Sequence, residues 1–336
     1  MRIVQLGPAD DDAVRACWDT RNAARAVDDL VNRPMALGTF TGWLRVGWSA
    51  NPSEAWYVPG EAAGAAAAGW CRLDFPDLEN RDRAFASIVV HPAVRRRGIG
   101  RALLRHAAAR SAAHGRSVIG SVGAIGSAGE AFARALGFAL GLEEDRRILD
   151  LRTVPEGQVA RLRAEAAAKA AGYSLIRWTG PTPEERLEQV AGLLNAMNDA
   201  PSDAGWEEDR WDARRVRERA DAGSVAAGQH IYSVAALHDA SGEMAGLTQV
   251  YVAPEVPDWG DQGITAVTRP HRGHRLGLLV KATMIEWLAE AEPDLTRVST
   301  DNAASNSYMI AVNEALGYRL APPGLQFYQI PVADVG

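Results

Sequence analysis

Two stretches of the chain share one pattern, and this repetition constrains the fold more than any other feature of the sequence. HPAVRRRGIGRALL stands at 91–104, and TRPHRGHRLGLLVK stands at 268–281. Each places arginines and glycines just before an apolar run with helical spacing. A turn followed by a helix, present twice in one chain, predicts an internal duplication.

A second pair of matched segments supports the duplication. ARALGF at 133–138 corresponds to NEALGY at 313–318, and both follow the first pair in the same order. The first pair is separated by 177 residues and the second by 180. Two matched blocks at nearly equal separations predict two copies of one unit, with an insertion of about three residues in the second copy.

Hydrophobic spacing and turn residues predict a similar order of elements in both copies. In the first copy we expect a helix at 8–31, strands at 54–59, 66–75 and 84–91, a helix that ends near Gly115, a strand at 116–122, a helix from Ser127 to Gly137, and a strand at 138–151. The alanine- and glycine-rich segment between the first two strands is interpreted as a flexible turn.

The second copy repeats this order. We expect a helix that begins near Thr182, strands at 231–237, 244–252 and 263–268, a helix after the second turn, a strand at 296–300, a helix at 303–316, and strands within 317–330. These elements predict an α/β (α+β) chain of two tandem domains, each with a mixed, mainly antiparallel sheet flanked by helices. The predicted ranges are 1–152 for the first domain, 153–172 for an alanine-rich linker helix, and 173–336 for the second domain.

Composition excludes several classes of function. A length of 336 residues, with 47% hydrophobic and 23% charged residues, is typical of a globular chain that buries its own cores. The net charge of −6 argues against non-specific nucleic-acid binding. Cys17 and Cys71 are too few for a disulfide scaffold and favour a reducing compartment. Since we find neither a signal-peptide pattern nor a run of about 18 apolar residues, we expect a cytoplasmic protein without a membrane partner.

The repeated turn has the composition of an anion-binding site. The backbone N–H groups of a first helical turn have no partner within the helix and lie at the positive end of its dipole. Glycines beside them let a phosphate approach the backbone closely. The turn lacks the Gly-Lys-Ser/Thr of a P-loop, and Leu103 stands where a Rossmann turn has its third glycine. We therefore expect a different kind of phosphate or pyrophosphate cradle.

The chain resembles the acyl-CoA N-acyltransferases of the GNAT superfamily. Their cofactor motif, Q/R-x-x-G-x-G/A after a central strand, is matched by RRRGIG at 95–100. TDNAASNSYMIAVNEALGY at 300–318 is similar to their polar segment before a helix that ends in Leu-Gly-Phe/Tyr. With the duplication, the whole chain looks like a tandem GNAT protein.

The resemblance implies acetyl-CoA as cosubstrate. Backbone amides of the turn would hold the pyrophosphate, the pantetheine arm would lie between two splayed central strands, and a strand amide would stabilise the oxyanion. The residues implied for cofactor binding are Val89, Val90, Arg95, Arg96, Arg97, Gly98, Ile99, Gly100 and Arg101 in the first copy, and Ala266, Val267, Arg272, Gly273, His274, Arg275, Leu276 and Gly277 in the second.

The two copies depart from the family pattern in complementary ways. The first keeps the cradle but has Ala133 where many members place a tyrosine acid. The second has Arg275 in place of Gly98, which we expect to narrow the approach to the backbone. Because polar groups cluster in the second copy, we expect it to be the catalytic one. Its candidate catalytic residues are Tyr308, Asn302, Asn313 and Asp261. Tyr308 qualifies as an acid only if its helix turns it inward.

Each feature also has a structural interpretation. The arginines of the first turn can form a solvated helix start, and the asparagines can cap a helix. His271 and His274 have H-x-x-H spacing but no evident third ligand, so we expect no metal site. Trp206, followed by the acidic residues 207–209, suits a loop for a cationic acceptor, with core packing and a solvated loop as the simpler explanation.

The sequence thus predicts an N-acetyltransferase that moves an acetyl group from acetyl-CoA directly to the amine of a small molecule. The alternatives are a non-catalytic acyl-CoA-binding or regulatory protein and a protein N-acetyltransferase. The first alternative is motivated by the missing tyrosine and by the absence of a glutamate in either central strand. We expect a monomer or homodimer without a nucleic-acid partner.

Overall fold

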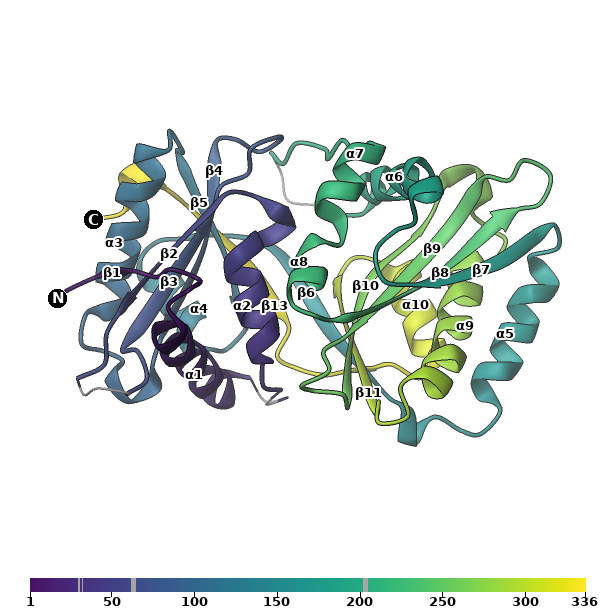
Figure 1. Cartoon of the computed structure of the whole chain (residues 1–336), viewed down its shortest axis with the longest axis horizontal. Helices are drawn as coiled ribbons and strands as arrows, with labels where there is room; N and C mark the ends of the chain where they lie inside the picture. The colour runs from purple at the N-terminus through teal and green to yellow at the C-terminus, as the bar shows by residue number, and fades with distance from the viewer. Residues whose placement is uncertain (30, 32, 62–64, 202–204) are drawn as a thin grey trace. The chain divides into compact units, whose positions relative to one another are not determined.

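The computed structural model describes residues 1–336 except 30, 32, 62–64 and 202–204. The chain divides into two compact units (Figure 1). Unit 1 comprises Met1–Glu144, Asp203–Glu207 and Pro322–Gly336, and unit 2 comprises Asp145–Ser202 and Glu208–Ala321. Each unit is described by itself below. Residues 62–64, part of the predicted alanine-rich turn, lie outside the described residues.

Unit 1 is built on a mixed sheet. Its strands are β1 (Val4–Gln5), β2 (Ser53–Val58), β3 (Gly69–Asp74), β4 (Arg83–Val90), β5 (Val118–Ala124), β13 (Leu325–Pro331) and the first half of β6 (Ala139–Asp150). Their order is β1-β2-β3-β4-β5-β13-β6. Only β4 and β5 pair in parallel, and the other neighbours are antiparallel, as the sequence predicted.

Helices cover both faces of this sheet. α1 (Asp11–Asp28) and α2 (Leu37–Val46) pack on one apolar cluster, and α3 (Ile99–Ala113) and α4 (Ala128–Ala135) pack on another. The predicted helix at 8–31 corresponds to α1, which Asp10 caps through the Ala13 N–H at 3.1 Å. α2 was not predicted, because its glycines and aromatic residues weaken the helical signal. The burial of Phe40 and Leu44 holds it in place.

Unit 2 repeats the arrangement. Its sheet runs β11-β10-β9-β8-β7, formed by β7 (Tyr173–Thr179), β8 (His230–His238), β9 (Met244–Val252), β10 (Trp259–Val267) and β11 (Arg297–Ala303). β10 and β11 are parallel, and β12 (Arg319–Leu320) pairs with the second half of β6. The helices are α5 (Gln158–Lys169), α6 (Leu187–Asn195), α7 (Ala213–Arg215), α8 (Ala222–Ala226), α9 (Leu276–Ala291) and α10 (Ser307–Leu316).

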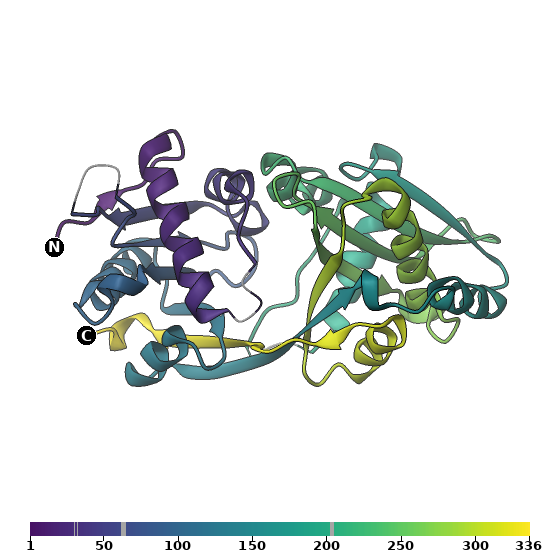
Figure 2. The ribbon, with the colours of Figure 1, turned by 90° about the horizontal axis from the view of Figure 1, so that it is seen from below.

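This division differs from the predicted domain ranges in two ways. The predicted linker helix, α5, buries Leu162 and Ala166 in the same core as α9, so it belongs to unit 2. The last strand, β13, pairs along its whole length with β5 of unit 1 and buries Tyr328 and Ile330 there. Figure 2 shows this C-terminal segment, in yellow, running through unit 1. The alternating pattern of a strand predicts its faces but does not name its partner.

From the central parallel pair onward the second copy has four extra residues, which are spread over several elements. The offset between matched residues is 176 at Arg83 and Trp259, where each central parallel pair begins. It rises to 177 because β10 contains one bulged residue between Gln262 and Thr265, opposite Val250 and Thr248. It reaches 180 at the glycines that end α4 and α10. The duplication is therefore conserved element by element. No helix among the described residues has the length and apolar character that a membrane crossing needs.

A buried ion pair ties α2 to the sheet of unit 1. Arg72 is fully buried, and its guanidinium donates to both oxygens of Asp74 and, at 2.9 Å, to the carbonyl of Trp43 in α2. It also lies 3.7 Å from the centre of the Trp43 ring. Asp74 accepts the N–H of Trp48 at 2.8 Å. Each charge is thus satisfied only while the other is present.

Arg72→Met should therefore lower the free energy of unfolding by about 3–5 kcal/mol, because it leaves the Asp74 carboxylate buried without a counter-charge. Arg72→Met combined with Asp74→Asn should recover much of that loss, since the amide still accepts the Trp48 N–H. Urea unfolding of the three proteins measures both effects. A double variant no more stable than Arg72→Met would contradict the argument from an unpaired charge.

Candidate active site

Both units contain a strand–turn–helix with the same backbone path. In unit 1, β4 leads through a short turn to Gly98, which caps α3 in the left-handed conformation with φ 83°. In unit 2, β10 leads to Arg275, which caps α9 with φ 57°. Two residues earlier each turn has another positive φ, 67° at Arg96 and 89° at Gly273. Each turn therefore has two residues in the left-handed conformation. In unit 1 the glycine is the second of them, Gly98, and in unit 2 it is the first, Gly273.

Arg275 does not alter the course of the turn. A non-glycine residue in the left-handed region costs about 1–2 kcal/mol, and each turn has one such arginine, Arg96 or Arg275. The Arg275 side chain is half exposed and its Nη1 lies 4.0 Å from Glu165. The expectation that Arg275 constricts the cradle is not met, because its backbone adopts the conformation that Gly98 has.

The first helical turns present unpaired amides. The first helix bond of α3 runs from the Ala102 N–H to the Gly98 carbonyl, at 3.0 Å. The N–H groups of residues 98–101 have no partner among the described residues. The same holds for residues 275–278, where the Leu279 N–H donates to the Arg275 carbonyl. A Cβ built on Gly98 meets no atom within 4 Å, so the space above these amides is open. Both turns fit an anion such as a pyrophosphate.

Two of the predicted cofactor residues anchor the turns instead. The Nε of Arg95 donates to the Val90 carbonyl at 3.3 Å, and its guanidinium also donates to Asp28. In the same way, Arg272 donates to the Val267 carbonyl at 3.2 Å and to Asp199 at 2.6 Å. These guanidinium groups fix each turn to the end of its central strand.

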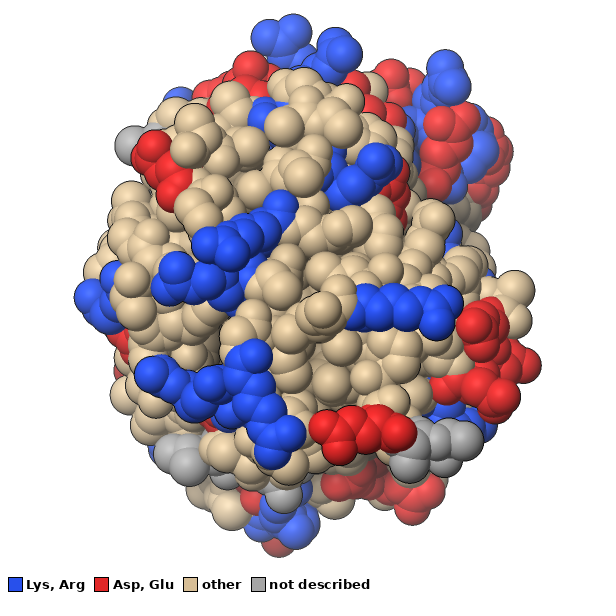
Figure 3. Space-filling model, turned by 90° about the vertical axis from the view of Figure 1, so that its left-hand side faces the viewer, with Lys and Arg blue, Asp and Glu red and all other residues tan. Residues whose placement is uncertain are grey.

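Other basic groups of the first turn remain available. Arg96, Arg97 and Arg101 are exposed, and the nearest recorded acid is Glu61, 3.8 Å from Arg97. Figure 3 shows Lys and Arg side chains spread over the face of unit 1 that carries α3, with acidic side chains mainly toward the edges of the view. In unit 2, His274 is exposed and its ring lies 5.3 Å from that of Tyr173.

The central parallel strands of each unit part after three residue pairs. In unit 1 the pairing of β4 with β5 ends at Phe85 and Gly120. In unit 2 the pairing of β10 with β11 ends at Asp261 and Ser299. Beyond these residues the backbone of each central strand faces its neighbour without a ladder. We call the region between the parting strands of each unit its opening.

The register decides which strand amides face this opening. The N–H of His91 donates to the Ala68 carbonyl, and that of Thr268 donates to the Ala245 carbonyl. Successive residues of a strand direct their amides to opposite sides. The amides of Val90 and Val267 therefore face the opening, and those of Val89 and Ala266 face the antiparallel neighbour. Of the predicted oxyanion donors, Val90 and Val267 are available, and Val89 and Ala266 are not.

The predicted catalytic residues are only partly brought together. Asn313, fully buried on α10, donates from Nδ2 to Oδ1 of Asn302 on β11 at 2.8 Å. Tyr308 is 59% exposed, so its helix does not turn it inward and the condition for an acid is not met. Asp261 accepts from the Ser299 hydroxyl at 3.1 Å at the end of the parallel ladder. The Asn302–Asn313 pair is therefore the part of the prediction that forms one cluster.

Comparison with known proteins identifies the family. Residues 26–138 match the acetyltransferase (GNAT) family. A tandem GNAT protein from the clavulanic acid biosynthesis pathway is 30% identical to this chain, with a TM-score of 0.80 over 98% of both chains. The chain belongs to the GNAT acetyltransferase family.

Other GNAT proteins resemble the chain over much of its length. The mycothiol acetyltransferase of Mycolicibacterium paratuberculosis is 28% identical over 260 residues, which cover 74% of this chain and 76% of that protein. A GCN5-related N-acetyltransferase from Sphaerobacter thermophilus is 15% identical and shares the fold, with a TM-score of 0.65 over 98% of this chain and 95% of that one. The tandem GNAT fold that the family resemblance and the duplication together implied is thus confirmed.

The two GNAT units differ sharply beneath their openings. The two units can be aligned through their strand registers, their turns and their Leu-Gly segments. In this alignment, six buried or half-buried positions of unit 1 correspond to six of unit 2. Unit 1 has apolar residues there: Cys71, Ala86, Ile88, Leu104, Ala133 and Phe138. Unit 2 has polar ones: Thr248, Gln262, Thr265, Lys281, Asn313 and Tyr318. We call these six residues of unit 2 the polar set.

Five of the six residues of the polar set, all except Asn313, are connected. Lys281 donates from Nζ to Oε1 of Gln262 at 2.8 Å and lies 4.8 Å from the centre of the Tyr318 ring. Gln262 in turn donates to the hydroxyl of Thr248 at 3.0 Å, and that hydroxyl is 2.8 Å from the hydroxyl of Thr265. The Oδ1 of Asn313 is buried and has no hydrogen-bond partner in the part of the chain that the structure describes. Burying polar groups is unfavourable unless they are satisfied, so an unpaired one in such a set indicates a functional role.

Sequence reasoning found Asn313 but missed the rest of the polar set. The signal was present in the repeated stretches, because Lys281 in TRPHRGHRLGLLVK stands where HPAVRRRGIGRALL has Leu104. The chain has only two lysines, and Lys281 is 2% exposed. Arginine is the chain's usual cation but does not lose its proton near neutral pH. A buried lysine can lose its proton near neutral pH.

His271, the first histidine of the H-x-x-H spacing, has a structural role. His271 is buried, its Nδ1 is 2.8 Å from the Tyr173 hydroxyl, and its Nε2 is 3.4 Å from Glu243. Within the described part of the chain, no three His, Cys, Asp or Glu side chains are grouped as metal ligands.

Lys281→Met should change how stability depends on pH. Burial lowers the pKa of Lys281 to about 7, whereas an unfolded lysine has a pKa near 10.4. Between these values the unfolded chain binds more protons, so the free energy of unfolding of the wild type rises with pH. Lys281→Met removes this contribution and should be the more stable protein at pH 7, with the difference shrinking toward pH 10.

Urea unfolding at several pH values between 7 and 10 measures this slope. Lys169→Met is the matched control, since Lys169 is exposed on α5 and should keep the wild-type slope. Parallel slopes for the wild type and Lys281→Met would show that Lys281 is already charged in the folded protein.

Proposed function

We propose that the chain transfers an acetyl group from acetyl-CoA to the amine of a small molecule, that both units bind acetyl-CoA, and that unit 2 carries out the transfer. The observation that carries acetyl-CoA binding is the shared turn, which places unpaired helix amides beside a parting strand pair in both units. When bound, acetyl-CoA supplies an activated acyl group as a thioester.

We assign the following roles in binding and catalysis to residues of the chain. Backbone amides 98–101 and 275–278 hold the pyrophosphate, and the exposed Arg96 and Arg101 lie close enough along the chain to pair with further phosphate oxygens. The N–H of Val90 or Val267 points into the opening, where a carbonyl oxygen that gains negative charge would need a donor.

The polar set supports unit 2 as the reacting unit. Attack by an amine requires that its ammonium proton be lost and that the departing thiolate be stabilised. Unit 1 has only apolar side chains at the corresponding positions, so it suits binding of acyl-CoA without transfer. In unit 2, Lys281 donates to Gln262 at the β10 bulge, and Asn313 offers a side-chain carbonyl oxygen that has no partner among the described residues. We assign Lys281 as a positioning residue, because it acts through Gln262.

A small-molecule acceptor is favoured over a protein by the relatives. The mycothiol acetyltransferases and the clavulanic acid pathway protein bear names that refer to small molecules. Among the described residues, Glu207 is bonded to the N–H of Asn80 at 2.9 Å, so the predicted role of this acid in an acceptor loop has a structural alternative. The acceptor is therefore to be sought with a panel of amines.

Gly98→Val tests the first cradle. A β-branched side chain resists φ 83° far more than an unbranched one such as that of Arg275 does. The turn should therefore change course, and we expect acetyl-CoA affinity at unit 1 to fall at least about tenfold, or 1.4 kcal/mol. Gly115→Val is the control, because Gly115 also has φ 69° and no atom within 4 Å of a built Cβ, but lies beyond the other end of α3. Calorimetric titration with acetyl-CoA measures both. Equal affinities in the two variants would refute a cradle at Gly98.

A reciprocal exchange tests which unit reacts. Asn313→Ala gives unit 2 the residue of unit 1, and Ala133→Asn does the reverse. We expect the first to lower kcat at least about tenfold and the second to leave it within about twofold. Release of the CoA thiol across a panel of amines, peptides and antibiotics measures turnover. The opposite ranking would move the chemistry to unit 1, and bound acetyl-CoA without release for any acceptor would favour the regulatory alternative.

The Lys281 assignment makes a separate prediction about pH. Lys281→Met should change the pH dependence of kcat, whereas Leu104→Met, at the matched position of unit 1, should not. If Lys281 served packing alone, Lys281→Met would lower kcat equally at every pH. That result would remove its positioning role.

A further inference from the structure

Helix α1 of unit 1 carries an arginine on its buried stripe. Val14, Cys17 and Ala24 are buried, and Arg21 stands at the helical spacing that continues their stripe. The Arg21 side chain is half-buried, and its Nε is closed to solvent without a hydrogen-bond partner in the described part of the chain. A charge on such a stripe needs a partner, because burial removes the water that would solvate it.

The described residues supply no counter-charge for Arg21. Burial and the neighbouring cations Arg25 and Arg72 lower the pKa of Arg21 to about 9, so the guanidinium is still charged near neutral pH. The acids nearby are paired with those neighbours: Asp29 lies 3.3 Å from Arg25, and Asp74 accepts from Arg72 at 3.1 Å. Among the described residues the cluster therefore keeps one positive charge that no acid balances.

Two tryptophans border this guanidinium. Arg21 lies 5.3 Å from the centre of the Trp43 ring on α2, and Trp43 meets Trp70 of β3 edge-on at 6.1 Å. Trp70 is fully buried, and its Nε1 is a second donor that has no partner in the described ranges. Trp43 is half-buried, so the cluster is not closed to solvent. Two such donors in one cluster suit an acceptor that a ligand supplies.

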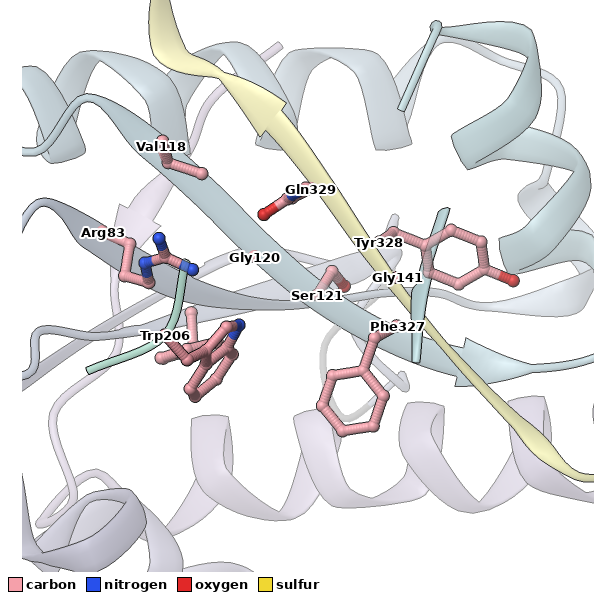
Figure 4. Close-up of a pocket in the computed structure, with 10 residues that line it drawn as sticks. Arg83, Val118, Gly120, Ser121, Gly141, Trp206, Phe327, Tyr328 and Gln329 are labelled. Carbon is pink, nitrogen blue, oxygen red and sulfur yellow. The ribbon is translucent and has the colours of Figure 1, made fainter. Parts of the chain in front are cut away.

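Arg83 shows how the chain satisfies an arginine that has a structural role. Figure 4 shows Arg83 beside Trp206, and its guanidinium lies 5.4 Å from the centre of that ring. The Nε of Arg83 donates to Asp82 at 3.1 Å, and its Nη2 donates to the Gly205 carbonyl at 3.3 Å. Arg21 has the same relation to a tryptophan but neither kind of acceptor among the described residues.

The cluster lies beside the central strand of unit 1. Trp70 pairs with Val89 of β4, and Arg72 pairs with Ser87. α1 and α2 cover this face of the sheet, whereas α3 and α4 cover the other. A ligand held by Arg21 would therefore lie on the face of the sheet away from α3.

We propose that Arg21 binds the carboxylate of a small molecule on the α1–α2 face of unit 1. A carboxylate carries the single negative charge that balances Arg21, and its two oxygens match the planar fork of a guanidinium. The Trp43 ring forms a wall beside the carboxylate. Binding here is separate from acetyl transfer, because it uses neither the turn at Gly98 nor the polar set.

Titration of the ¹⁵N-tryptophan-labelled chain with acetate, without acetyl-CoA, tests the proposal. The indole N–H signals of Trp43 and Trp70, assigned with Trp43→Phe and Trp70→Phe, should shift saturably, with half-saturation at about 10 mM or below. Acetamide has nearly the same shape without the charge, and methylammonium has the opposite charge, so neither should move these signals. Inorganic phosphate should bind more weakly than acetate, since its second charge has no match.

Arg21→Met should abolish the acetate-dependent shifts and should fold, because it places an apolar residue on the buried stripe of α1. Arg15→Met is the matched control, since Arg15 is exposed on the same helix and its loss should leave the shifts unchanged. Urea unfolding gives a second measurement. Acetate should raise the unfolding midpoint of the wild type, relative to sodium chloride at equal ionic strength, and should not raise that of Arg21→Met.

Four results would overturn the proposal: no saturable shift up to about 100 mM acetate, equal shifts with acetamide, tighter binding of phosphate than of acetate, or a wild-type response in Arg21→Met. Failure of acetyl transfer would leave these titrations unaffected.

Discussion

The parting of two parallel strands after three residue pairs is the constraint on which both units depend. A parallel ladder that continued would close the space between the central strands and bury their backbone groups in pairing. Because it stops at Phe85 and Gly120 in unit 1, and at Asp261 and Ser299 in unit 2, each unit has an opening between its strands. The turn at the far end then brings helix amides to the same opening. Arg95 and Arg272 fix this relation by bonding the turn to the last carbonyl of the strand.

Because the chain is duplicated, the side chains of the two units can be compared on nearly the same backbone. Their backbones agree even in the two left-handed residues of the turn, although the glycines occupy different positions. What differs is the chemistry beneath the opening, where six apolar residues of unit 1 correspond to six polar residues of unit 2. The backbone that we propose for acyl-CoA binding is present in both units, and the buried polar groups are present in unit 2. This contrast supports the division of labour that we propose more strongly than either unit does alone.

The repeated stretches were sufficient to predict the tandem GNAT fold, because the turn, the helix and the Leu-Gly segment are local patterns that recur in order. They could not predict that β13 joins unit 1 or that α5 packs against α9, since both depend on partners distant in sequence. The two turns have the backbone with unpaired helix amides that the sequence led us to expect, but the sequence did not determine how individual side chains and strand amides are oriented. Tyr308 lies outward, and Val89 and Ala266 turn their amides to the antiparallel strand. Lys281 was missed because an isolated lysine in an apolar helix has no local signature, although comparison with Leu104 reveals it.

The central claim is that both turns remain working cradles despite Arg275. Native mass spectrometry of the intact chain, titrated with acetyl-CoA, counts the bound molecules directly. Two molecules per chain, falling to one in Gly98→Val and remaining two in Gly115→Val, is the predicted result. A maximum of one molecule in the wild type would contradict it, because one turn would then be closed in spite of its open backbone.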